Sequence, residues 1–383
     1  MIETPFFEHH LTLDAATLRA MEHTHELTDD IHCQYLGMLN FLDQMYYRNG
    51  NSSFAQIRTR QSVFTLAQAM PSLAILDPDR TREITYNLNV CGIVMDMPLL
   101  TCALDGFNSE PIRLVETALI LAFYRLVGGR SLHDGRFHEC ARLLYEKMRF
   151  NGCSMQQTWG VETCAGIYQI VPNLWALMAF RIHDRIFGTD YSRIEPDVMQ
   201  WIRRELIDSD TGLFREYYKT GAFGIPDEKL CPEAFWHSTT LPAHVNALCI
   251  CYMHYFDPEI AERAWKAFKP RFLPELLALR TEDIADGTGR SYLTQLAPAT
   301  EALYGALLAA KELRDDTVFE QLQRHIFAIT GPSMRENKLF LDDVQEERLH
   351  GYYLLLARAH VGWENIMSHD WAPDYMRDYK KVR

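Results

Sequence analysis

The sequence lacks the local motifs of several familiar enzyme classes. It contains no phosphate-binding P-loop, no GxGxxG after a strand pattern, no HExxH and no GxSxG. Its nine cysteines form no CxxC pair, and neither they nor the fifteen histidines show the spacing of a metal site. Nucleotide-binding, zinc-protease and serine-hydrolase chemistry of the usual kinds is therefore not indicated.

Long hydrophobic runs and basic runs are also missing. The apolar stretch 118–127 is interrupted by Arg125 and is far shorter than the ~20 residues of a membrane-spanning helix. The chain has 38 basic and 51 acidic residues, a net charge of −13, which argues against nucleic acid or an anionic membrane as main partner. Residues 1–10 lack a charged leader and an apolar signal core, so we expect a cytoplasmic protein with free thiols.

Helical patterns dominate the chain, and period-2 strand patterns are scarce. About a dozen helical segments follow one another, mostly in adjacent pairs with short connectors, and no low-complexity linker divides them. We therefore predict one all-α domain over residues 1–383, an (α/α)6 barrel or helical toroid. Two longer segments, 150–172 and 209–238, are rich in glycine and aromatics, and we predict that they are active-site loops with a short hairpin.

One carboxylate lies in an apolar and aromatic run. Leu36, Leu39, Asp43 and Tyr47 recur at helical spacing, which places Asp43 on the apolar face of its helix. Loss of hydration raises the pKa of a carboxyl group and makes it a usable proton donor near neutral pH. The structural alternative is a surface aspartate or one that pairs with Arg48.

Two further residues on apolar helical patterns are candidates for acid/base work. Glu116 lies within the pattern 112–123, and a second carboxylate in the same dry pocket as Asp43 would push the two pKa values apart. Alternatively, Glu116 interacts favourably with the helix dipole or pairs with Arg113. His244 is either a core histidine or a pocket residue.

The aromatic loops supply candidates for substrate contact. No base or positive charge is visible near Cys164 that would ionise its thiol, so pocket lining is a better role for it than nucleophilic attack. Tyr47, or Tyr46 in its place, would orient the substrate hydroxyl or Asp43; the structural alternative is that both are core or rim aromatics. The substrate-binding residues that we predict are Tyr46, Trp159, Glu162, Cys164, Tyr168, Trp236 and His237.

Several strings of the sequence together resemble the linalool dehydratase/isomerase family. Residues 40–43 (NFLD), followed by Tyr46 and Tyr47, are similar to that family's catalytic aspartate and its neighbouring tyrosine. The resemblance covers about residues 30–330. Its other pieces are AILDP, FYRLVGG, DRIFGTDY, WIRRELIDSDTGLF, HYFDPEIAERAWKAFKPRF and ATEALYGALLAAKELRDDTVFEQL.

The resemblance implies a single (α/α)6 barrel, often assembled into a ring of subunits, that needs no metal and no organic cofactor. It also implies an activity in which a small terpene alcohol is protonated, loses water, and isomerises or eliminates through an allylic cation or a concerted equivalent. Such chemistry needs a proton donor, a base, and an apolar aromatic pocket that excludes water.

The sequence departs from the family at several active-site positions. The family histidine falls on Glu116 and a tyrosine falls on His244, while two cysteines fall near Thr163 or Cys164 and on Pro172. Only the aspartate and its tyrosine are retained. The resemblance therefore implies a related scaffold with a hydrophobic substrate other than linalool.

The leading hypothesis from the sequence is a cofactor-independent lyase, isomerase or cyclase that acts on an isoprenoid alcohol or polyene. Its catalytic residues would be Asp43, Tyr47, Glu116 and His244, and it would form a homo-oligomer. The first alternative is a carbohydrate-active (α/α)6 enzyme, a glycoside hydrolase or an epimerase, that uses Asp43 and Glu116. The second is a non-catalytic binding protein for a hydrophobic metabolite.

Overall fold

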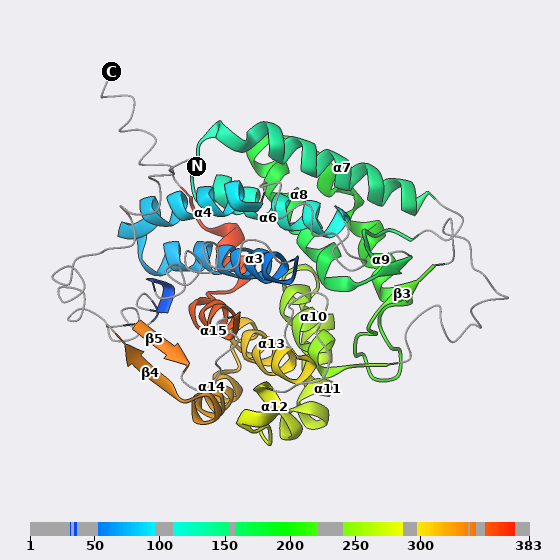
Figure 1. Cartoon of the computed structure of the whole chain (residues 1–383). Coiled ribbons are helices and arrows are strands. Elements are labelled where there is room, and N and C mark those ends of the chain that lie inside the picture. Colours follow the sequence, from blue (N-terminus) through cyan, green and yellow to red (C-terminus); the bar gives the residue numbers. More distant parts are fainter. Residues whose placement is uncertain are drawn as a thin grey trace.

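The chain folds mainly into helices, as the sequence predicts, and its few strands are short (Figure 1). In the part of the chain that the structure describes, no helix has both the length and the apolar character that crossing a bilayer requires. The computed structural model describes residue 31 and residues 34–36, 53–95, 110–153, 158–164, 166–220, 240–285, 297–335, 338–341 and 349–371.

One set of helices is buried on almost every side and is called the core helices below. Its described side chains are nearly all shielded from solvent, for example residues 61–74. A helix that is apolar around its whole circumference belongs in the interior. The core helices are α3 (Ser53–Leu76), α6 (Glu110–Leu126), α8 (Ile170–Phe187), α10 (Ala243–Phe256), α13 (Pro298–Glu312) and α15 (Leu349–Ala359).

A second set of helices, called the outer helices, buries only one face. In α14, for example, Val318, Leu322 and Ile326 are buried at four-residue spacing while the residues between them are largely in solvent. The outer helices cover the core helices from outside (Figure 1). They are α4 (Thr81–Met95), α7 (Asp134–Gly152), α9 (Glu195–Glu205), α11 (Pro258–Leu276) and α14 (Asp316–Thr330).

The core helices contact one another in sequence order. Helix α3 packs against α6, α6 against α8, α8 against α10, α10 against α13, α13 against α15, and α15 against α3. Contacts join late residues to late residues: Tyr252 of α10 bonds to Gln68 of α3, and Glu312 at the end of α13 bonds to His360 directly after α15. The contacting helices α3, α10, α13 and α15 therefore run in the same direction.

The connectors differ in length at the two ends of the core helices. After a core helix the chain turns quickly: Asp257 alone joins α10 to α11, and residues 313–315 join α13 to α14. Before a core helix the connector is longer, as in 96–109, 206–242 and 331–348. The end where the core helices begin is called the loop end below, and the opposite end is called the turn end.

A small antiparallel sheet lies between the two predicted loops. Its strands are β1 (Glu162–Cys164), β2 (Ile167–Tyr168) and β3 (Tyr218–Lys219), so the second loop pairs with the hairpin of the first. The predicted loop 150–172 is too long, because α7 continues to Gly152 and the apolar pattern of α8 already begins at Ile170. The remaining elements are α12 (Thr281–Ala285), α16 (Trp363–Ser368), the hairpin β4 (Pro332–Arg335) and β5 (Lys338–Leu341), and three short 3-10 turns, η2 (Pro78–Arg80), η3 (Ser131–His133) and η4 (Tyr191–Ile194).

Candidate functional site

Glu116 is fully buried in the first half of α6 and is held by two side chains of α3. Its carboxylate oxygen Oε2 lies 2.9 Å from Arg60 Nε, and Gln61 Nε2 donates a hydrogen bond of 3.3 Å to Oε1. The ion pair of Glu116 is made with Arg60 on a neighbouring helix rather than with Arg113 on its own helix. A buried charge needs such a partner, because water is excluded.

The protonated form of Glu116 is favoured more strongly in the protein than it would be in water. Burial raises the pKa of Glu116, while the positive charge of Arg60 and the hydrogen bond from Gln61 lower it, and burial prevails. A carboxyl group of this kind exchanges a proton at a higher pH than an exposed glutamate does. It is therefore suited to general acid/base catalysis.

Several buried polar atoms near the loop end have no hydrogen-bond partner among the described residues. They are Gln61 Oε1 and Ser62 Oγ on α3, Thr117 Oγ1 on α6 and Tyr304 Oη on α13. Each belongs to the first half of its core helix. Buried polar groups in proteins are normally paired, so this end of the helices has the capacity to bind polar groups of a ligand.

Tyr304 lies beside two other ionisable residues of the loop end. Its ring packs edge-on against His350 of α15, with ring centroids 5.5 Å apart. Glu301, one turn earlier on α13, is also buried. The pKa of Cys249 on α10 is raised by the burial of Cys249 itself and by the negative charge of Glu301. Glu301 is thus a second buried carboxylate in the first half of a core helix.

Deeper between the core helices, aromatic rings form a continuous series. Phe64 meets Trp175 edge-on with centroids 4.7 Å apart, and Trp175 meets Tyr252 at 5.6 Å. Tyr252 stacks on Trp363 at 5.4 Å, and Trp363 stacks on Phe123 at 6.2 Å. Aromatic faces of this kind bind apolar ligands and stabilise positive charge.

Five of the predicted site residues lie outside the described residues: Asp43, Tyr46, Tyr47, Trp236 and His237. Their proposed roles stay predictions. Cys164 belongs to β1, but its side chain is also outside the described part of the structure.

His244 lies in the first turn of α10 and is half-buried. Burial lowers its pKa, and the nearby charge of Glu216 acts in the opposite direction. A neutral imidazole at the loop end can accept a proton, which is compatible with the predicted pocket role.

The predicted residues of the first loop lie in and beside the small sheet. Glu162 accepts a hydrogen bond of 2.7 Å from the backbone N–H of Gly166 and so closes the hairpin turn. Tyr168 is buried edge-on against Trp201 of α9, with centroids 6.0 Å apart, and Trp159 is half-buried. Strand β1 packs on α6, the helix of Glu116, so the sheet borders the loop end.

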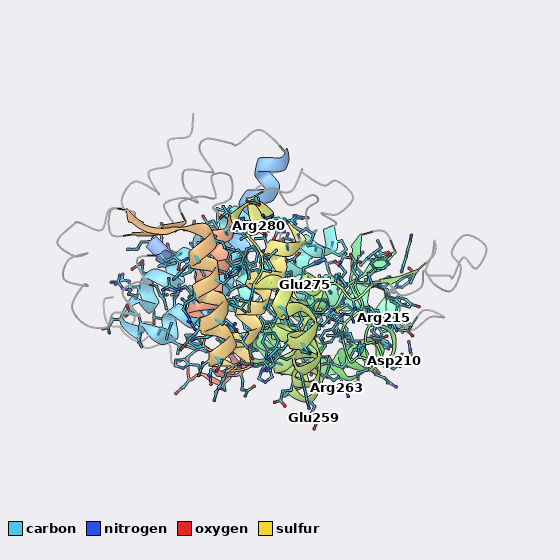
Figure 2. All side chains as sticks on the ribbon, turned by 90° about the horizontal axis from the view of Figure 1, so that it is seen from below. Asp210, Arg215, Glu259, Arg263, Glu275 and Arg280 are labelled. Atoms are coloured by element: carbon cyan, nitrogen blue, oxygen red, sulfur yellow. The ribbon has the colours of Figure 1, made fainter. Side chains whose placement is uncertain are left out.

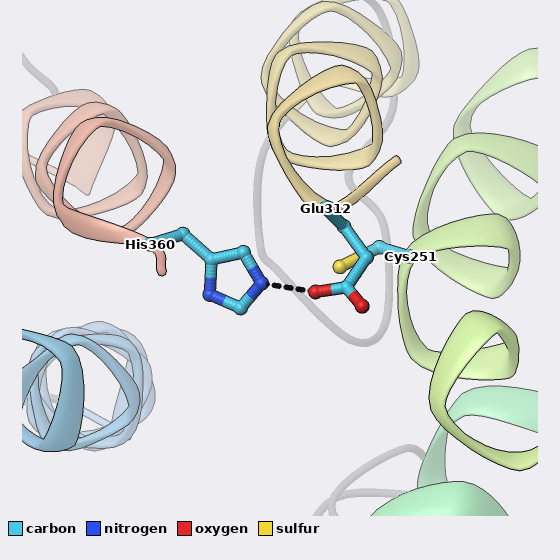
Figure 3. A group of neighbouring side chains, drawn as sticks. All are labelled: Cys251, Glu312 and His360. Carbon is cyan, nitrogen blue, oxygen red and sulfur yellow. Dashed lines mark hydrogen bonds and ion pairs between the residues drawn. The ribbon is translucent and has the colours of Figure 1, made fainter. Parts of the chain in front are cut away.

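The turn end holds a different polar cluster, around Glu312 (Figure 3). Its Oε1 lies 2.7 Å from His254 Nδ1, and its Oε2 lies 2.5 Å from His360 Nε2 and accepts a bond of 3.0 Å from the backbone N–H of Trp363. Burial alone would raise the pKa of Glu312, but the hydrogen bonds from His254 and His360 outweigh it and hold that pKa at about 2. Glu312 is therefore ionised at neutral pH.

A charged cleft of about 990 Å³ lies on the outer surface between α9 and α11. Asp210, Arg215, Glu259 and Arg263 lie in this region (Figure 2). Arg215 pairs with Asp208 at 2.9 Å, and Arg203 pairs with Asp257 at 2.6 Å. A cleft lined by so many charged side chains does not suit a hydrophobic substrate, so we place the candidate site at the loop end instead.

Sequence reasoning found Glu116 but missed its partners Arg60 and Gln61 and the hydroxyl of Tyr304. The available signal was that Arg60 and Gln61 directly precede a long buried stretch of α3, where polar side chains require partners. No protein-family model matches the chain.

Proposed function

We propose that the chain is a cofactor-independent acid/base enzyme, a lyase, isomerase or cyclase, acting on a small hydrophobic substrate of the isoprenoid type. The single observation that carries this proposal is the fully buried Glu116, which has a raised pKa and lies among apolar core helices. A proton-exchanging group in such surroundings suits chemistry that passes through a carbocation and must exclude water.

We propose further that the fold is an (α/α)6 toroid. The order of contacts from α3 through α6, α8, α10, α13 and α15 back to α3 supports this arrangement, as does the outer layer of helices. The long connectors before the core helices support a substrate opening at the loop end. A single domain over residues 1–383 and relationship to the linalool dehydratase/isomerase family belong to the same proposal.

In the proposed reaction, Asp43 in its protonated form donates a proton to the hydroxyl of a prenyl alcohol. The C–O bond breaks with its electron pair leaving on water, and the resulting allylic cation is stabilised by aromatic faces such as those of Phe64 and Trp175. The carboxylate of Glu116 then takes a proton from carbon, and the electrons of that C–H bond form the new double bond. A proton returns from Glu116 to Asp43 before the next turnover.

The residues around Glu116 have defined parts in this scheme. Arg60 holds the carboxylate in place and offsets its negative charge, and Gln61 fixes the orientation of Oε1. The hydroxyl of Tyr304 is available to bind the substrate oxygen, because it has no other partner among the described residues.

A carbohydrate enzyme is the second candidate, favoured by one observation. Two buried carboxylates, Glu116 and Glu301, and the unpartnered hydroxyls of Ser62, Thr117 and Tyr304 all belong to the first halves of core helices. Sugars need many polar partners, and paired carboxylates are the groups that cleave glycosidic bonds.

The test is incubation of the full-length protein with a panel of prenyl alcohols, linear polyenes and oligosaccharides, with products identified by mass spectrometry. We expect conversion of a prenyl substrate without added cofactor, and losses of about 10²-fold or more in Asp43→Asn and Glu116→Gln. Glu139→Gln is the matched control, because Glu139 is an exposed glutamate on α7.

Other outcomes distinguish the candidate functions. Sugar products would establish the carbohydrate enzyme. Tight binding of a prenyl alcohol without conversion, unchanged in Glu116→Gln, would indicate a binding protein. Full turnover in both carboxylate variants would refute the acid/base mechanism.

A further inference from the structure

Four potential metal ligands converge at the turn end from three core helices. Cys251 and His254 lie one turn apart on α10, Glu312 ends α13 and His360 directly follows α15. The ligand atoms of Cys251, Glu312 and His360 all lie within 4.8 Å of one another, and Figure 3 shows these three side chains turned toward a common point. His254 Nδ1 joins them, 2.7 Å from Glu312 Oε1.

We propose that Cys251, Glu312 and His360 form a zinc site that locks the turn end of α10, α13 and α15, and that His254 completes it by rotation of its side chain. Thiolate sulfur, imidazole nitrogen and carboxylate oxygen are the donor atoms of zinc in proteins, and structural sites are usually four-coordinate. The inference concerns stability and does not depend on the proposed enzymatic function.

The charge of the group suits a divalent cation. The Cys251 thiolate and the Glu312 carboxylate together carry two negative charges, and His254 and His360 are neutral as metal ligands. A zinc ion therefore brings the cluster to zero net charge. Neutrality matters here because the side chains of Glu312 and His360 are only 2% and 0% exposed, and an uncompensated charge at such a depth is costly.

The spacing of the side chains needs little adjustment. In the structure the ligands are joined by hydrogen bonds, with His360 Nε2 at 2.5 Å from Glu312 Oε2. Zinc bonds of about 2.0–2.1 Å to nitrogen and oxygen place neighbouring ligand atoms roughly 3.3 Å apart. The Glu312 and His360 atoms have to separate by less than ~1 Å, and the Cys251 sulfur already lies within 4.8 Å of both. His254 Nδ1 lies outside this group and has to move farther to complete the site.

Groups around the ligands hold them in position. The backbone N–H of Trp363 donates to Glu312 Oε2, and the Trp363 ring packs on His360 with centroids 4.8 Å apart. Such supporting contacts orient metal ligands and raise metal affinity. The side chain of His254 is 25% exposed, so an ion can reach the cluster from solvent.

The test measures metal directly on the purified full-length protein. After incubation with Zn²⁺ and dialysis, we expect one zinc per chain by elemental analysis. With Co²⁺ in place of Zn²⁺, we expect a thiolate-to-cobalt charge-transfer band and the visible bands of a tetrahedral site. Cys251→Ser should abolish the charge-transfer band and cut the zinc content at least tenfold.

Cys249→Ser is the matched control, because Cys249 is also buried on α10 but lies two residues away from the cluster. It should keep full zinc content and the cobalt spectrum. The proposal is overturned if wild-type protein retains no zinc, if its cobalt form shows no thiolate band, or if Cys251→Ser keeps both. The first two outcomes are measured on wild type, so they decide the matter even where a variant does not fold.

Discussion

At the loop end, the hydroxyls of Ser62, Thr117 and Tyr304 are buried without a hydrogen-bond partner among the described residues. At the turn end, both carboxylate oxygens of Glu312 accept hydrogen bonds. The hydroxyl of Tyr252 also donates a hydrogen bond to Gln68 Oε1. Among the described residues, unpartnered hydroxyls therefore mark the first halves of α3, α6 and α13, whereas at the turn end the Glu312 carboxylate is satisfied and the unpartnered atoms are ring nitrogens, His360 Nδ1 and Trp363 Nε1.

This difference suggests that one end of the helices binds a ligand and that the other end stabilises the fold. An unsatisfied buried group costs roughly 1–3 kcal/mol, which a folded protein tolerates where a ligand restores the hydrogen bonds. A satisfied network fixes the packing of the helices that contribute to it. The loop end is accordingly where we expect substrate to bind, and the turn end is where we expect mutations to unfold the protein.

The largest stability effect should come from Glu312→Gln at the turn end. The amide keeps the volume of the side chain but removes the charge that accepts hydrogen bonds from His254 and His360. Two charge-assisted hydrogen bonds at 1.5–3 kcal/mol each make a loss of about 3–6 kcal/mol in the free energy of unfolding. Urea denaturation with a chelator present measures it free of any metal effect.

The control for that change is Glu320→Gln, at an exposed glutamate of α14. It should alter the free energy of unfolding by less than ~0.5 kcal/mol. Equal effects of the two substitutions would show that the Glu312 network does not stabilise the turn end.

Arg60→Met at the loop end should cost somewhat less, about 3 kcal/mol, the lower end of the range for a broken buried ion pair. The reason is that Glu116 can escape its unpaired charge by binding a proton, since loss of the Arg60 charge raises its pKa further. The double variant Arg60→Met/Glu116→Leu should regain most of the lost stability. Additive losses in the double-mutant cycle would contradict a direct interaction between the two side chains.

For two buried tyrosines we expect different changes in stability when the hydroxyl group is removed. Tyr252→Phe removes the donor to Gln68 Oε1 and should cost about 1–2 kcal/mol. Tyr304→Phe removes a hydroxyl without a described partner and should leave the free energy of unfolding unchanged or slightly higher, while KM for the substrate rises. Thermal and urea unfolding of both variants, with steady-state kinetics, checks the pair; a reversed order would break the distinction between the two ends.

The smallest effect concerns His183, late in α8, and appears only in acid. Thr189 donates its hydroxyl proton to Asp184, so His183 Nδ1 must donate to Thr189 and its Nε2 must accept from His138. Burial, and then the charge of His138, lower the pKa of His183 to about 4. The unfolded chain therefore binds the proton first, and stability is lost as pH falls from about 6.5 to 4.

At pH 5 we expect a loss on the order of 1 kcal/mol relative to pH 7. His183→Gln should be less stable at neutral pH but should lose this part of the acid dependence. Urea denaturation of both proteins at several pH values measures it. An unchanged acid dependence in the variant would show that another group is responsible.

Local sequence patterns predicted a large part of the helical structure. Residues 53–76 have the pattern of one helix, and they form α3 with Pro71 inside it. An aspartate followed by proline, as at Asp77, is typical of a helix start, yet this segment opens with the 3-10 turn η2, and the Asp77 carboxylate pairs with Arg80. Exact helix starts depend on such competing contacts, which local patterns do not resolve.

The sequence alone determined that the chain is helical and that the helix of Glu116 is apolar, because each follows from residues that lie close together along the chain. It left open whether Glu116 lies in a pocket or pairs with Arg113. Only the tertiary structure decided that Glu116 pairs with Arg60 rather than Arg113, and that Cys251, His254, Glu312 and His360 meet. Those neighbours come from different helices, and the packing of helix on helix, which no local spacing encodes, selects which side chains face one another.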